Sequence, residues 1–410
     1  MAPTSQSPKP EPLPRRFWIA ALVAFVNAVG FTMIIPLIYP YALQFGLSDF
    51  QASLLTTAYA LAQFLGTPIL GRLSDRMGRK PLLVLSLLGT VAANVMAALA
   101  TTAAVLYAAR LLDGLTGGNT SIAQAVVGDI TTPEQRPRAY GIFGALFRLG
   151  FVAGPPLSYL AQLVPPLPGF TPLGMGFLLS ALMALLATVL CVLLLPETLA
   201  TCCEKFRLSW RDFGLGRMAK SMGDPRFGRT FWLTFFSGFT FTIFTFAFQP
   251  FFLNVLGQNA QNLAIMFAVF GVIGFATQVF GLEPLRRHFS LVTILAATLA
   301  ARGVLFLLMP AFPNLIAFGL ITVVFSAVNS FPMPMIDAIL SLKSGPQEQG
   351  EILGTNASYL SMSNALGPAT AGILVSVSYG LPFWVAGSLT LLTAGFALTL
   401  QAPAALKEPR

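Results

Sequence analysis

The chain has 410 residues, of which 55% are hydrophobic and 10% are charged, and its formal net charge is +9. An ordinary soluble domain carries roughly 25% charged residues, so this composition excludes a globular protein that faces water on all sides. The basic excess would suit a nucleic-acid-binding protein, but the positions of the lysines and arginines favour a membrane protein.

Apolar stretches long enough to cross the ~30 Å hydrocarbon layer recur along the whole chain. They do not alternate polar and apolar residues as the strands of a membrane barrel do, so helices are expected. The predicted spans are 17–43, 50–72, 80–100, 103–129, 136–164, 171–195, 229–256, 259–282, 289–309, 313–341, 348–379 and 381–403. We therefore predict an all-α integral membrane protein with twelve transmembrane helices.

The segment 1–16 lacks the apolar core and cleavage site of a signal peptide, and it reads as a disordered cytoplasmic tail. With this tail inside, every lysine and arginine except Arg110, Arg148 and Arg302 lies in the cytoplasmic tails, loops or loop edges. This is a strong positive-inside pattern. It predicts a multi-pass protein of the plasma (inner) membrane, with both termini cytoplasmic, a lipid bilayer around it and no nucleic-acid partner.

A basic linker, 196–228, divides the chain into two predicted six-helix bundles, 17–195 and 229–403, and a short cytoplasmic tail follows at 404–410. Spaced residues of the first bundle recur in the second at a constant shift of 213 residues: Pro133, Gly141 and Gly154-Pro155 as Pro346, Gly354 and Gly367-Pro368. Gln63-x-x-Gly66 recurs similarly as Gln278-x-x-Gly281. Copies with an even number of helices have the same orientation, so we expect two pseudo-symmetric bundles with a cavity between them.

A charged loop, GRLSDRMGRK, joins the second and third predicted helices at residues 71–80. Its glycines permit a tight turn, its acid can meet an arginine or a helix N-terminus, and its last two basic residues can face lipid phosphates. We predict a gating loop formed by Gly71, Asp75, Arg76, Gly78, Arg79 and Lys80. An ordinary positive-inside loop would explain the basic residues but not an acid between two glycines.

The fourth, fifth, tenth and eleventh predicted helices contain charged residues that can pair, and glycines and prolines at which a helix can bend. Arg110 and Asp113 are three residues apart on one helical face, and they are either a coupling pair or a structural ion pair. Asp129 and Asp337 can pair with nearby Arg136, Arg138 or Lys343, as gating locks or as solvated end-caps. Hinge positions are predicted at Gly150, Gly154, Pro155, Gly367 and Pro368, where close packing alone is the alternative.

Polar groups inside predicted spans are candidates for the cavity wall. They are Asn27, Gln63, Arg148, Gln124, Gln249 and Gln278. Arg148 is expected to face the cavity, whereas Arg302 either faces it or extends outward to the membrane surface. The phenylalanines of the seventh helix are expected mainly to contact lipid, with part of one face reaching the cavity.

Four motifs resemble those of the major facilitator superfamily. The 71–80 loop is similar to the family's signature loop, and LYAARLLDGLTGG around Arg110 is similar to its helix-4 motif. Gly150-x-x-x-Gly154-Pro155 resembles the motif of the drug:proton antiporter branch, and with GDITTPE at 128–134 the chain resembles the tetracycline-resistance-like group. The resemblance implies two six-helix bundles and a role for Arg110 in proton coupling.

Tetracycline itself does not fit well as a substrate. Where tetracycline exporters carry intramembrane acids, this chain has Asn27 in helix 1, Asn94 in helix 3 and Arg302 in helix 9. An amide cannot bind and release a proton as a carboxylate does.

Two transport hypotheses follow. The first is export of a small or amphipathic organic molecule by alternating access, in exchange for protons, with Arg110 and Asp113 as the coupling pair. The second is export, or flipping across the bilayer, of an anionic metabolite or lipid-linked headgroup held by Arg110, Arg148 and Arg302. The chain has one histidine and no cluster of reactive groups, so we expect no enzyme activity, no metal and no cofactor, in a monomeric protein.

Overall fold

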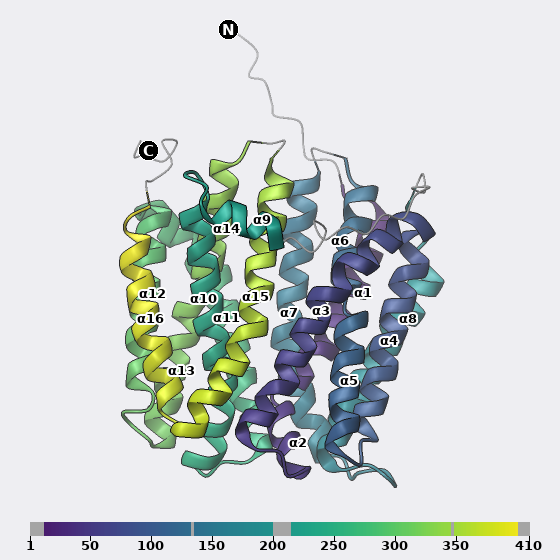
Figure 1. The fold of residues 1–410 in the computed structure, drawn as a ribbon. Helices are drawn as coiled ribbons and strands as arrows, with labels where there is room; N and C mark the ends of the chain where they lie inside the picture. Colours follow the sequence, from purple (N-terminus) through teal and green to yellow (C-terminus); the bar gives the residue numbers. More distant parts are fainter. Residues whose placement is uncertain (1–11, 133–134, 200–214, 346–347, 401–410) are drawn as a thin grey trace.

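The computed structural model describes residues 12–132, 135–199, 215–345 and 348–400, and every regular element in these ranges is a helix (Figure 1). The first half contains α1 (Arg15–Ile34), α2 (Ile38–Gln44), α3 (Asp49–Met77), α4 (Arg79–Ala98), α5 (Ala103–Thr116), α6 (Asn119–Ile130), α7 (Arg136–Leu163) and α8 (Pro172–Leu194). The second contains α9 (Leu215–Met222), α10 (Gly228–Pro250), the π-helix η2 (Phe251–Val255), α11 (Ala260–His288), α12 (Leu291–Leu308), α13 (Leu315–Asn329), α14 (Pro332–Lys343), α15 (Gln349–Val377) and α16 (Leu381–Ala397).

Twelve crossings follow from these helices. Ten helical spans within the described ranges are long and apolar enough to cross a membrane, and α16 is a shorter apolar helix. The helices α5 and α6 together make the remaining crossing. The twelve-helix prediction is therefore confirmed. Most of the predicted tails and the middle of the predicted linker lie outside the described residues.

Two crossings that the sequence predicted as single helices, 103–129 and 313–341, are each broken in the middle. The first break lies at Gly117 and Gly118, between α5 and α6, and the second at Ser330 and Phe331, between α13 and α14. These positions are again related by 213 residues. A break leaves backbone groups without helical partners. The Gly117 carbonyl oxygen accepts a hydrogen bond from Gln63 Nε2 at 3.2 Å.

The predicted hinge residues form the same contact in both halves. In the first half, Thr32 Oγ1 on α1 donates to the Gly150 carbonyl on α7 at 2.8 Å. In the second, Thr242 Oγ1 on α10 donates to the Ser363 carbonyl on α15 at 3.0 Å. A β-carbon on Gly154 or Gly367 would collide with the hydroxyl oxygen of the same threonine. Glycine is therefore required at both positions by this close helix packing.

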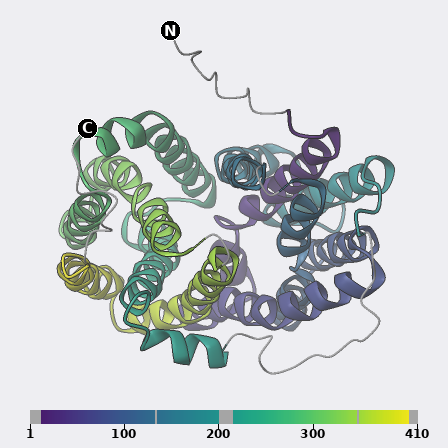
Figure 2. The ribbon, with the colours of Figure 1, turned by 90° about the horizontal axis from the view of Figure 1, so that it is seen from above.

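The two halves meet mainly through α3 against α15 and α7 against α11. Figure 2 shows the first half (purple to blue) and the second half (green to yellow) as two groups of helices, seen from the end at which the described chain begins and finishes. We call this end the terminal face. At the opposite end, a β-carbon on Gly372 of α15 would collide with the Ser53 side chain of α3.

Candidate functional site

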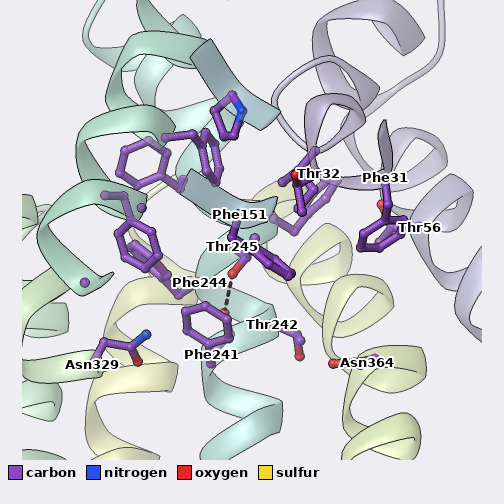
Figure 3. A pocket seen from close by; sticks show the side chains of 18 of the residues that line it. Phe31, Thr32, Thr56, Phe151, Phe241, Thr242, Phe244, Thr245, Asn329 and Asn364 are labelled. Carbon is purple, nitrogen blue, oxygen red and sulfur yellow. Dashed lines mark hydrogen bonds between the residues drawn. The ribbon is translucent and has the colours of Figure 1, made fainter. Parts of the chain in front are cut away.

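A cavity of about 530 Å³ lies between the two halves, within the size range of sites that hold drug-like molecules. Figure 3 shows Phe31, Thr32 and Thr56 of the first half across from Phe241, Phe244 and Thr245 of α10. Its aromatic wall consists of Phe31, Tyr59, Phe151, Phe241, Phe244, Phe246, Phe248, Phe267, Phe270 and Phe275. Such a wall favours planar or apolar molecules.

The predicted cavity residues divide into two groups. Gln63, Arg148, Gln249 and Gln278 are in the cavity wall, whereas Asn27 and Gln124 are not among the lining residues. The wall also contains polar side chains that the sequence did not single out: Asn329, Ser330 and Asn364.

The expectation that the phenylalanines of the seventh crossing mainly contact lipid is wrong. Phe244, Phe246 and Phe248 are each 3% exposed, and Phe236, Phe239 and Phe241 are partly buried. The rings of Phe244 and Phe325, on α10 and α13, have centroids 4.4 Å apart. The crossing is therefore enclosed by neighbouring helices, and its aromatic side chains build the core and cavity wall of the second half.

Arg110 and Asp113 form a buried ion pair on α5. The distance from Arg110 Nη2 to Asp113 Oδ2 is 2.7 Å, and the residues are 1% and 4% exposed. The Arg110 guanidinium also lies over the rings of Tyr59 and Phe177, at 5.4 and 5.8 Å from their centroids. Arg110 and Tyr59 line the cavity. The pair is thus shielded from bulk water while one member borders the space for a substrate.

Arg148 and Asp337 carry opposite charges that interact across the two halves without a direct ion pair between them. Arg148 lines the cavity, is exposed to its open space, and has no hydrogen-bond partner in the described part of the chain. Asp337 Oδ1 accepts a hydrogen bond from Asn356 Nδ2 at 3.0 Å, and Asn356 Oδ1 accepts one from Thr234 Oγ1 at 2.5 Å. The carboxylate is thus hydrogen-bonded within the second half, whereas no hydrogen bond holds the guanidinium among the described residues.

Arg302 neither lines the cavity nor extends outward, being 2% exposed inside the second half. Its Nη2 donates to Ser237 and to Thr240 Oγ1, the latter at 3.1 Å, and its Nη1 donates to Asn329 Oδ1 at 3.3 Å. Within the described ranges, no carboxylate forms an ion pair with it. Asn329 lies at the edge of the cavity (Figure 3), so its side-chain amide stands between the buried Arg302 guanidinium and the cavity.

The predicted gating loop lies at the terminal face and ties helix ends of the first half together. Arg79 contacts Asp75 Oδ1 at 2.5 Å and Asp129 Oδ2 at 3.0 Å, and its Nη1 donates to Ser74 Oγ at 2.7 Å. The sequence suggested Arg136 as a partner of Asp129, but Arg136 Nη2 donates to the Gly128 carbonyl. Gly71 and Arg76 lie on the last turns of α3, while Gly78, between α3 and α4, adopts a φ of 104°, which favours glycine.

Glu197, which the sequence did not single out, caps α4 beside this loop. Its carboxylate accepts hydrogen bonds from the backbone N–H groups of Arg79 and Lys80 at 2.9 and 3.1 Å, and from those of Thr198 and Leu199. Burial raises the pKa of Glu197, but the four backbone donors together outweigh it, so the pKa lies below its ordinary value. The only sequence signal was a single acid directly after a predicted span.

A polar cluster closes the end opposite the terminal face. Tyr39 OH on α2 donates to Asp49 Oδ1 at 2.5 Å and accepts from Asn254 Nδ2 of η2 at 2.9 Å. Asn254 Nδ2 also donates to Tyr379 OH at 3.1 Å. We call Tyr39, Asp49, Asn254 and Tyr379 the latch, because it joins the two halves next to the Ser53–Gly372 contact.

Comparison with known proteins places this arrangement in a family. The family model of the Major Facilitator Superfamily matches residues 20–301 and 230–410. Multidrug resistance protein 1 of Bacillus subtilis (strain 168) is 28% identical over 387 residues, covering 93% of this chain and 95% of the relative. Tetracycline resistance protein, class C, of Escherichia coli is 29% identical over 391 residues, covering 90% and 92%. The crystal structure of the human organic anion transporter MFSD10 has a TM-score of 0.70 at 22% identity, covering 94% of this chain and 100% of that chain, which supports the fold alone.

Proposed function

Because this chain belongs to the Major Facilitator Superfamily, we propose that it exports a small or amphipathic organic molecule by alternating access in exchange for protons. The observation that carries the proposal is the cavity of about 530 Å³ lined by residues of both halves. When two bundles rock against each other, a site between them closes to one side of the membrane and opens to the other. The multidrug and tetracycline resistance relatives support export as the direction.

Two features support a rocking motion. The latch holds the halves together at the end away from the terminal face, while Arg148 and Asp337 interact electrostatically across the halves without a direct bond. We infer that this conformation faces the terminal side, and the positive-inside pattern supports assigning that side to the cytoplasm. The threonine–glycine contacts at Gly154 and Gly367 allow the helices of each bundle to move as closely packed units.

Arg110 and Asp113 support proton coupling. A carboxylate that is 4% exposed and paired with an arginine beside the cavity can lose its pairing when it is protonated. Asp113 would then bind a proton when the cavity is open to the outer side and release it when the cavity is open to the inner side. Asp129 with Arg79 on the cytoplasmic face, and Asp337 with Arg148, serve as gate charges in this scheme. We propose a monomer as the working unit.

The test is uptake into proteoliposomes. Protein molecules whose cytoplasmic side faces the bath are expected to carry dye into the lumen when the lumen is acidic, because protons then leave in exchange. Fluorescent dyes, drugs, sugars and organic anions are compared with and without the pH gradient. The wild-type protein is expected to accumulate at least one compound only with the gradient. Asp113→Asn abolishes the response, whereas Glu283→Gln, a change of a 63% exposed surface carboxylate, leaves it intact. Gradient-driven uptake that survives in Asp113→Asn would remove Asp113 from the mechanism.

A further inference from the structure

The charged groups of the cavity are unbalanced. Arg110 and Arg148 line it, and no aspartate or glutamate is among its lining residues in the described part of the chain. Arg110 is neutralised by Asp113 at 2.7 Å, which leaves Arg148 as the cation that faces the open space. Asp337 interacts with Arg148 only at a distance. A guanidinium in a largely apolar cavity strongly favours an anion, because few other groups there can compensate its charge.

Arg302 adds a second source of positive potential behind the wall. It is 2% exposed, and neutral oxygens of Ser237, Thr240 and Asn329 surround it. Because a guanidinium only donates hydrogen bonds, Asn329 must turn its carbonyl oxygen toward Arg302. The amide N–H groups of Asn329 are then directed to the cavity side, where they suit an acceptor.

We propose that the cargo is an amphipathic organic monoanion, with a carboxylate or sulfonate bound by Arg148 and an aromatic body packed on the phenylalanine wall. A single negative charge on the cargo would balance the net charge of these interior groups, because the arginines outnumber the aspartates by one. The groups are Arg110, Arg148, Arg302, Asp113 and Asp337. A planar guanidinium without other partners can bind a carboxylate or sulfonate with two parallel hydrogen bonds. The proposal rests on the proposed transport function, since it names the substrate class of the same cavity.

The test measures binding to purified protein in nanodiscs of neutral lipid, with no gradient. Anilinonaphthalene sulfonate is compared with phenylnaphthylamine, which has the same rings without the charge. Arg148→Gln is expected to weaken binding of the sulfonate by about 10-fold or more, as loss of charge-assisted hydrogen bonds implies. Binding of phenylnaphthylamine should change less than about twofold, because its ring contacts remain. Arg287→Gln, a change of a 72% exposed surface arginine, is the matched control.

A second variant separates recognition from folding. Asp337→Asn removes the distant negative charge that opposes an anion near Arg148, so the affinity for the sulfonate should rise at least about twofold. A purely structural role for the two residues predicts losses for both probes in both variants. Competition with lysophosphatidylglycerol and with a soluble aromatic carboxylate shows whether the anion comes from a lipid headgroup or from a free acid.

Equal losses for the charged and uncharged probes in Arg148→Gln would overturn the proposal, as would tighter wild-type binding of the cation ethidium than of the sulfonate. Those results would leave proton-driven export of another substrate class intact. Conversely, selective anion binding without any gradient-driven uptake would overturn the proposed transport mechanism and leave this assignment standing.

Discussion

Replacing Tyr39 with phenylalanine is expected to open the end opposite the terminal face. The substitution removes the hydroxyl that donates to Asp49 at 2.5 Å and accepts from Asn254 at 2.9 Å. Tyr39 is fully buried, so the remaining ring still fills its space against Phe246, at 5.9 Å between centroids. The perturbation therefore removes one hydrogen bond between the halves, to Asn254, and one within the first half, to Asp49.

The hydrogen bond to Asn254 is the one that joins the halves, and its net contribution is about 1 kcal/mol. If that bond exists only while this end is closed, the closed state loses about 1 kcal/mol relative to the open state. The bond to Asp49 lies within the first half, so its loss affects both states equally. That corresponds to roughly a 5-fold rise in the open-to-closed ratio. A ligand that favours the open state would then need correspondingly less differential affinity to populate it.

The assay is the labelling rate of Ser53→Cys by a membrane-impermeant maleimide, in a background without the natural cysteines. Ser53 is fully buried against Gly372, so labelling requires separation of the halves. Tyr107→Phe is the matched control, because Tyr107 OH donates to the Gln51 carbonyl within the first half. Faster labelling in Tyr39→Phe alone is predicted. Equal rates in wild type and Tyr39→Phe would refute the assignment of the latch.

Three further predictions concern stability. Asp113→Asn leaves the buried Arg110 charge without a partner and should cost about 3–5 kcal/mol, whereas the double change Arg110→Met/Asp113→Leu should cost less, as thermal unfolding in detergent will show. A double variant no more stable than Asp113→Asn would contradict this explanation. Gly154→Ala and Gly367→Ala should each cost about 1–3 kcal/mol by overpacking against Thr32 or Thr242, and Thr32→Ala should restore part of the loss only in Gly154→Ala. For Glu197, whose folded pKa is lowered, the stabilisation is present above its ordinary pKa of 4.5 and is lost as the pH falls through the folded value. The difference in melting temperature between wild type and Glu197→Gln should thus be constant from pH 7 to about 4.5 and shrink below it, and a gap that widens in acid would reverse the sign of the proposed linkage.

The sequence predicted the crossings and the duplication because both depend on local information. Hydrophobic length determines which segments span the membrane, and the Gly154-Pro155 and Gly367-Pro368 pairs keep their spacing in the two copies. The broken crossings were missed because Gly117-Gly118 is compatible with a continuous membrane helix until Gln63 takes the freed carbonyl.

Contacts between distant segments were harder to predict. Tyr39 and Asn254 are separated by 215 residues, and Glu197 reaches Arg79 from 118 residues away. Neither pairing has a sequence pattern. The sequence allowed two positions for Arg302, the cavity wall or the membrane surface, and both were wrong. Its actual position, buried among neutral oxygens, depends on side chains of α10 and α13, which the sequence pattern does not bring together.

Simultaneous recording of cargo and protons in one proteoliposome preparation tests the central claim most directly. A pH-sensitive dye trapped in the lumen reports protons, and the fluorescence of the transported compound reports cargo. Coupled exchange predicts that protons leave the lumen as cargo enters, at a fixed ratio over a range of cargo concentrations, and that Asp113→Asn abolishes both movements. Cargo uptake with an unchanged lumenal pH, or protons entering together with cargo, would contradict the account.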